Sequence, residues 1–174
     1  MTIRSGHSLR GTAVVTLDNG ERLGRVDDLF FAPTTGDLEA LLVDVGGLFS
    51  KPSLLSAAQI SSIGPDAVVI ADREALVPNG TLTEEARAVR AGEIEDRAVL
   101  TTNGTVVGKV SDVLIDTDTR QVTAFSVATG VIDNALHGRP SLPFSLVQSL
   151  GKDSLVVSAD YDPKAPEHHI PLAK

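Results

Sequence analysis

The stretch NGERLGRVDDLFFAPTTGDLEALLVDVG, residues 19–46, returns further along the chain as NGTVVGKVSDVLIDTDTRQVTAFSVATG, residues 103–130. At a shift of 84 residues, nine of these 28 positions are identical, and many of the rest are conservative exchanges. After a three-residue insertion in the second copy, the match resumes and continues to Val69 and Val156. The identities fall on glycine, aspartate and apolar positions, which predicts two copies of one structure.

Each copy has the pattern of short strands separated by turns. The Asn-Gly pairs at 19–20 and 103–104 predict tight hairpins in which both residues adopt positive φ. The expected strands are 12–17, 22–32, 38–45 and 67–71 in the first copy, and 106–116, 122–129, 144–150 and 154–159 in the second.

The strand expected at 38–45 is apolar on both faces. Strict alternation places Leu41 and Val43 on one face, and Leu38 and Ala40 on the other. A small sheet of this kind must wrap around its own core and also pack against something else.

Between the copies, residues 81–92 predict a short helix. Thr81 can cap its start, Arg90 falls in its last turn, and Gly92 suits the left-handed position after its end. The expected organisation is a first copy at 8–72, a linker with a short helix at 73–95, a second copy at 96–160 and an extended tail at 161–174.

The composition argues against several classes of partner and site chemistry. The net charge is −8 and no run of Lys or Arg occurs, so phosphate backbones and anionic lipids should repel the chain. Five Phe, one Tyr and no Trp leave few rings for stacking, and we expect no nucleic-acid partner. The absence of Cys excludes disulfides, thiolate nucleophiles and Cys-ligated zinc. No signal core or long apolar run is present, which favours a soluble, cytoplasmic protein without an integral membrane segment.

Two repeated carboxylates are the most tempting chemical feature. Asp28 and Asp112 could form a paired site, but we favour a structural role in which each accepts backbone N–H bonds. The pair Asp116 and Asp118 lacks the Gly and Glu of a calcium loop and indicates a β-turn. No helical His pair, nucleophile elbow or nucleotide loop appears. We therefore expect no catalytic, cofactor or metal site, and no enzyme.

The order of these motifs, occurring twice, resembles the PRC-barrel family. The pattern runs from Asn-Gly-x-x-Leu-Gly-Arg-Val-x-Asp to Ile-x-x-Ile-Gly-x-Asp-x-Val-Val, and it covers about 10–70 and 97–159. The second copy has a similar proline-aromatic pair at Pro143-Phe144, whereas the first has Ser56-Ala57. The resemblance implies compact all-β barrels used for protein–protein contacts, as in the cytoplasmic domain of the photosynthetic reaction-centre H subunit and the C-terminal domain of RimM-type ribosome maturation factors. The chain shows neither the H subunit's membrane helix nor a RimM-type N-terminal domain, so neither specific role is carried over.

Together these features predict an all-β fold of two tandem small barrels joined by a short helical linker, serving as a non-catalytic interaction or scaffolding module. A protein partner or self-association is expected. The alternative is a small-ligand or stress-related binding protein that uses a cleft between the copies.

The segments after the long strands differ most between the copies, and loops commonly carry recognition. The candidate contacts are Leu48 and Phe49 in the first copy, and Leu136 and His137 in the second. For Phe49 the alternative is that its ring folds back to cap its own barrel.

Overall fold

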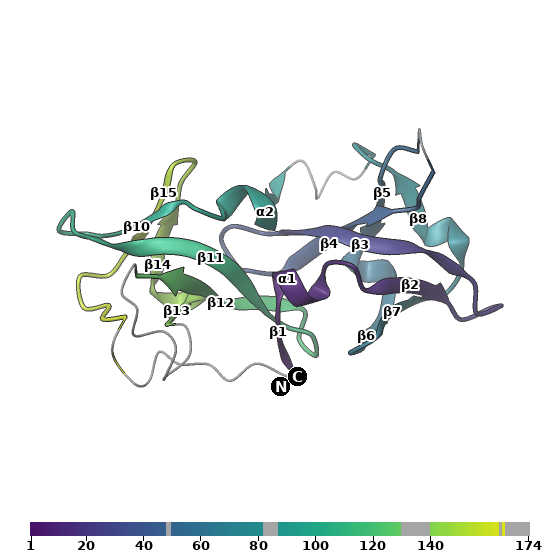
Figure 1. Cartoon of the computed structure of the whole chain (residues 1–174), viewed down its shortest axis with the longest axis horizontal. Coiled ribbons are helices and arrows are strands. Elements are labelled where there is room, and N and C mark those ends of the chain that lie inside the picture. The colour runs from purple at the N-terminus through teal and green to yellow at the C-terminus, as the bar shows by residue number, and fades with distance from the viewer. Residues whose placement is uncertain (48–49, 82–86, 130–139, 164, 166–174) are drawn as a thin grey trace.

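The computed structural model describes residues 1–47, 50–81, 87–129, 140–163 and 165. Its strands form two curved sheets that lie side by side along the long axis of the molecule (Figure 1). In this part of the chain, no helix is long and apolar enough to cross a membrane.

The first repeat builds a sheet in the order β6-β7-β2-β3-β4-β5-β8. Its elements are β2 (Ala13–Thr16), β3 (Arg22–Phe31), β4 (Leu38–Asp44), β5 (Ser53–Ser56), η1 (Ala57–Gln59), β6 (Ile60–Ile63), β7 (Ala67–Ile70), η2 (Arg73–Ala75) and β8 (Leu76–Pro78).

The second repeat builds a sheet in the order β13-β12-β11-β10-β15-β14. Its elements are β10 (Ala98–Thr101), β11 (Val106–Asp116), β12 (Gln121–Ala128), β13 (Ser141–Pro143), η4 (Phe144–Leu146), β14 (Val147–Leu150) and β15 (Ser154–Val157).

Corresponding residues of the two repeats pair in the same way within their own sheets, which confirms the predicted duplication. Val26 pairs with Val43 between β3 and β4, and Val110 pairs with Val127 between β11 and β12. Both long hairpins also carry β-bulges at matching positions, one of them immediately before Asp28 or Asp112.

The N-terminal strand of each repeat pairs with the sheet of the other repeat, and a short helix follows it. β1 (Ile3–Ser5) pairs with the end of β11 and leads into α1 (Gly6–Leu9). β9 (Val89–Arg90) pairs with the end of β3 and leads into α2 (Ala91–Ile94). Figure 1 shows both helices at the centre, where the two sheets meet. This region is called the junction below. The repeats are therefore joined by a reciprocal exchange as well as by the covalent linker.

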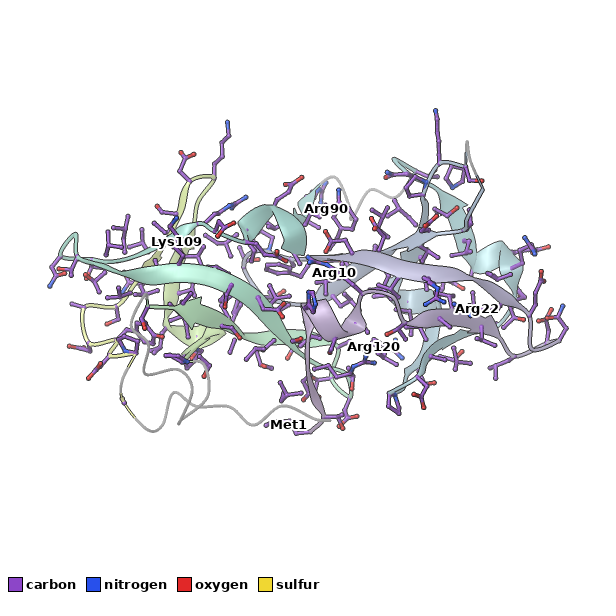
Figure 2. The ribbon with its side chains drawn as sticks, in the orientation of Figure 1. Met1, Arg10, Arg22, Arg90, Lys109 and Arg120 are labelled. Carbon is purple, nitrogen blue, oxygen red and sulfur yellow. The ribbon has the colours of Figure 1, made fainter. Side chains whose placement is uncertain are left out.

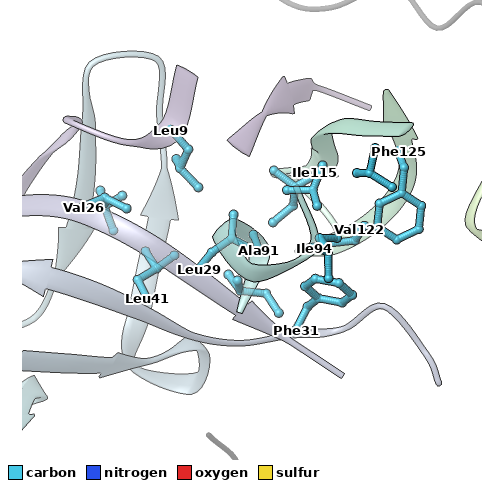
Figure 3. Packing of buried hydrophobic residues seen from close by; sticks show 14 of the residues in the cluster. Leu9, Val26, Leu29, Phe31, Leu41, Ala91, Ile94, Ile115, Val122 and Phe125 are labelled. Atoms are coloured by element: carbon cyan, nitrogen blue, oxygen red, sulfur yellow. The ribbon is translucent and has the colours of Figure 1, made fainter. Parts of the chain in front are cut away.

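The main hydrophobic core runs through both repeats. Phe31 and Phe125, from different sheets, are fully buried with ring centroids 6.2 Å apart, and Phe144 lies 5.8 Å from Phe125. Leu9 and Ile94 from the two exchanged helices belong to the same cluster (Figure 3). Burying such side chains is the main favourable term in folding, so the junction stabilises both repeats at once.

Strict alternation along β4 is wrong at its start. Leu38 joins Leu41 and Val43 in the main core, whereas Ala40 and Leu42 pack on the other face. The bulge at Glu39 causes this, because one extra residue reverses the side-chain direction. Both faces are covered as expected.

The Asn-Gly turns also differ from the prediction. Within each Asn-Gly pair only the glycine has positive φ, 71° at Gly20 and 83° at Gly104. The loops are longer than two residues, because the Thr16 N–H donates to Glu21 O and the Thr101 N–H donates to Thr105 O.

The described end of the helix expected over 81–92 differs from the prediction. Residues 82–86 lie outside the described part, Val89 and Arg90 form a strand, and α2 begins at Ala91. Gly92 thus lies inside a helix, where a Cβ atom would come within 2.6 Å of Asp28 Oδ2. Pairing with β3 outweighs the local capping signal. The tail expected from residue 161 begins packed, since Tyr161 is buried and its hydroxyl donates to Ser141 O.

Candidate functional site

The two repeated carboxylates meet the exchanged helices at the junction. The carboxylate of Asp28 accepts the N–H of Leu29 at 2.9 Å and that of Gly92 in α2 at 3.2 Å. Asp112 accepts the N–H of Val113 at 2.8 Å and that of His7 in α1 at 3.1 Å. The structural interpretation is confirmed, because each side chain caps the helix that the other repeat contributes.

Asp28 also anchors a charge network. Its side chain is 4% exposed and lies 3.1 Å from Arg10 Nη2 and 2.7 Å from Arg90 Nε. Arg10 continues to Glu95 at 2.7 Å, and Arg90 to Asp27 at 3.2 Å. Figure 2 shows Arg10 and Arg90 together at the centre of the molecule. A buried carboxylate is stable here because cations and backbone donors surround it.

Among the residues that the structure describes, the network has no counterpart around Asp112. Arg90 stands directly before α2, and the residue directly before α1 is Ser5. No described cation forms an ion pair with Asp112. The junction is therefore twofold in its backbone but asymmetric in its charges.

A second contact closes the junction between the hairpin ends. Asp37 and Gln121 face each other in an isolated antiparallel bridge, and Gln121 Nε2 donates to Asp37 Oδ1 at 2.7 Å. Leu38 N–H donates to Arg120 O and Val122 N–H to Gly36 O, both at 2.8 Å. Because Asp37 and Gln121 are corresponding residues, the pseudo-twofold axis passes between them.

Side-chain size is also complementary across this contact. The guanidinium of Arg120 donates to Ala57 O at 3.0 Å and Ser61 O at 3.3 Å in the first repeat. Gly36, which corresponds to Arg120, lies against Phe144. A Cβ at Gly36 would meet Val122 O at 2.6 Å and the ring of Phe144 at 3.5 Å.

Asp116 and Asp118 form a turn that holds the N-terminal arm. The buried carboxylate of Asp116 accepts the N–H groups of Asp118 at 3.0 Å and Thr2 at 3.3 Å. Asp118 forms an ion pair with the amino terminus at 3.0 Å. Burial alone raises the pKa of Asp116, but the hydrogen bonds from Asp118 and Thr2 outweigh it, and the pKa lies below its ordinary value.

Stability should therefore fall in acid. The Thr35 hydroxyl and the Gln121 amide lower the pKa of Asp37, and Asp116 is shifted the same way, both from 3.8. A lowered folded-state pKa gives stability that is present above pH 3.8 and is lost as pH falls through the folded-state value. We expect the urea midpoint to fall when the pH is lowered below 3.8. This fall should be smaller in Asp116→Asn than in the exposed control Asp153→Asn. Equal pH dependence in both variants would contradict this role for Asp116.

The contacts at the junction join the two repeats. Among the described residues no group of three His, Asp or Glu side chains could hold a metal ion. The candidate contacts Leu48, Phe49, Leu136 and His137 lie outside the described residues. Sequence reasoning missed the roles of Arg10, Arg90, Glu95 and Arg120 at the junction. A search for corresponding positions that differ in charge could have marked them, since their counterparts are Glu95, Ser5, Arg10 and Gly36.

Two all-β repeats that exchange their N-terminal strands and share one core define a tandem barrel-type module. The PRC-barrel domain model matches residues 1–77 and 87–163, and the chain belongs to the PRC-barrel family with two copies of the domain. A search of curated proteins found no match.

Proposed function

We propose that this protein is a non-catalytic scaffold whose β4–β5 and β12–β13 connections form the contact surface for a protein partner. Tandem PRC-barrel domains are compatible with an interaction module. The two connections occupy corresponding places in the repeats and differ most in sequence. A duplicated frame that keeps its core and varies its loops is suited to recognition.

The observation that carries the proposal lies at the base of the first connection. Val45 directly follows β4 and is 36% exposed. In the described ranges, the other exposed large hydrophobic residues are Met1, Leu17 and Val106. Leu48 and Phe49 come three and four positions after Val45, in a Gly/Ser/Pro-rich segment. An apolar group that begins at an exposed valine and contains a phenylalanine has the composition of a contact anchor.

The frame supports such a contact by fixing where its connections begin. Val43 and Val127, near the ends of β4 and β12, are fully buried in the shared core. Fixing the ends of a connection lowers the conformational entropy that it loses when a partner binds.

The alternative of a ligand cleft between the copies is disfavoured. Side chains fill the space between the sheets, with Phe31, Phe125, Ile94 and Ile115 all buried in one cluster (Figure 3). A ligand there would have to displace part of the core.

The double substitution Leu48→Ser with Phe49→Ser tests the proposal. We expect the affinity for a captured partner, or the self-association constant from sedimentation, to fall by about thirtyfold, because losing a contact anchor costs about 2 kcal/mol or more. The melting temperature should barely change.

The matched control is Leu17→Ser with Val106→Ser, which removes two exposed apolar side chains elsewhere, 66% and 62% exposed. This control should bind as the wild type does. If Leu48→Ser/Phe49→Ser instead melts many degrees lower and association per folded molecule is unchanged, Phe49 belongs to the core and the docking proposal fails.

A further inference from the structure

The inner surfaces of the two repeats meet around a pseudo-twofold axis, and at two places corresponding residues contact each other. Asp37 faces Gln121 at the hairpin ends. Arg10 and Glu95, the residues that directly follow α1 and α2, form an ion pair at 2.7 Å. In a contact between two identical repeats, a residue at the axis meets its own copy.

The charges at these places match only when the two different repeats pair. A first repeat paired with another first repeat would place Arg10 against Arg10 and Asp37 against Asp37. A second repeat paired with its copy would place Glu95 against Glu95. Like charges opposed in a contact weaken binding and exclude the wrong partner.

Side-chain sizes follow the same rule. In the observed pairing Arg120 lies over the backbone of Ala57 and Ser61, while its counterpart Gly36 leaves room for Phe144. Two first repeats would bring Gly36 against Ala57 and leave a gap. Two second repeats would bring Arg120 against Phe144, where even a Cβ on the glycine side lies 3.5 Å from the ring.

We propose that the junction is a selective pairing surface, on which the first repeat binds the second repeat, from its own chain or from a second copy, and neither repeat binds itself. Charge and size provide the selection at Arg10/Glu95, Asp37/Gln121 and Gly36/Arg120. The inference goes beyond the proposed function, because it concerns the inner surface and holds whichever protein contacts the loops.

The test starts from the folded full chain with a protease site placed between residues 81 and 87. Isotope-labelled and unlabelled proteins are cleaved, mixed, and warmed until labelled and unlabelled fragments have redistributed, and native mass spectrometry then counts the pairs. We expect each first repeat to pair with a second repeat, whether labelled or unlabelled. Homotypic pairs, in which two first or two second repeats associate, should stay below about a tenth of the total, since a tenfold preference needs only modest like-charge repulsion. Homotypic pairs at statistical abundance, or fragments that do not pair at all, would overturn the proposal.

The second readout compares two charge reversals, one at Glu95, the C-cap of α2, and one at Glu93 within α2. Glu95→Arg, which opposes Arg10 with a like charge, should raise the Kd of the cleaved pair about tenfold or more. Glu93→Arg makes the same charge change on an exposed neighbour in α2 and should raise the Kd less than about threefold. Equal effects of the two reversals would show that the Arg10–Glu95 contact does not select the partner.

Discussion

Replacing Asp28 with Ala should lower the free energy of unfolding by about 3 kcal/mol, the cost of leaving buried charge partners without their counter-ion. The substitution removes the acceptor for Leu29 and Gly92 N–H groups and leaves Arg10 and Arg90 facing each other. The arginine side chains are 26% and 37% exposed, so water compensates part of the loss and the effect lies at the low end for buried pairs. Urea unfolding followed by circular dichroism gives the value.

Two further variants make this result specific. Asp27→Ala removes the neighbouring carboxylate, which is 47% exposed and bonds only the outer side of Arg90, and it should cost less than about 1 kcal/mol. Asp112→Ala removes a helix cap that has no cation partner in the described part of the chain, and it should cost about 1 kcal/mol. If Asp28→Ala is no more destabilising than Asp27→Ala, the network does not hold the junction.

Phe125→Ala should have the largest effect, a loss of about 3–5 kcal/mol. The ring is fully buried in β12 and lies near Phe31 of the other repeat and Phe144 of its own. Its removal leaves a cavity at the junction, and a shared core predicts that both repeats lose this stability in one cooperative transition. Val106→Ala, at an exposed strand position, should stay within about 0.5 kcal/mol of the wild type. Two separate urea transitions, with only one shifted by Phe125→Ala, would contradict the shared core.

The sequence predicts the duplicated sheets because their signals are local. In each repeat the turn glycines and apolar strands lie within one hairpin, and Val43 and Val127 hold corresponding positions in the two hairpins. The repeat therefore supports each assignment twice. The bulge at Glu39 escapes this reasoning, since its cause is the geometry of the paired strand rather than the period of its own residues.

The exchanged elements could not be predicted in the same way. β1 and β9 have three and two residues, too few to show a period, and their partners lie in the other repeat. One signal was present in the chain: Ala13, Val14 and Thr16 match Ala98, Val99 and Thr101 at a shift one residue longer than that of the long hairpins. Following this match toward the N-terminus aligns α1 with α2 and indicates that the duplicated unit starts before residue 8.

The charge network shows a different limit. Asp28 and Arg90 are 62 residues apart in sequence and become neighbours through the exchange. The repeat comparison marks Asp28 and Asp112 as a pair but does not show that cations surround one and not the other. Asymmetry between corresponding positions carries the specificity of the junction, and a search for identities overlooks it.

Hydrogen–deuterium exchange on the whole chain, read by mass spectrometry in the wild type and in Phe125→Ala, tests most directly whether the two repeats are one folding unit. We expect the amides of β1 and β9 to exchange with the same free energy as those of β3 and β11, because the exchanged strands open only when both sheets open. Phe125→Ala, placed in the second repeat, should lower protection in β3 and β4 of the first repeat by the same amount as in β11 and β12. Full protection retained in the first repeat of that variant, or rapid exchange of β1 and β9 in the wild type, would show that the repeats are separate folding units.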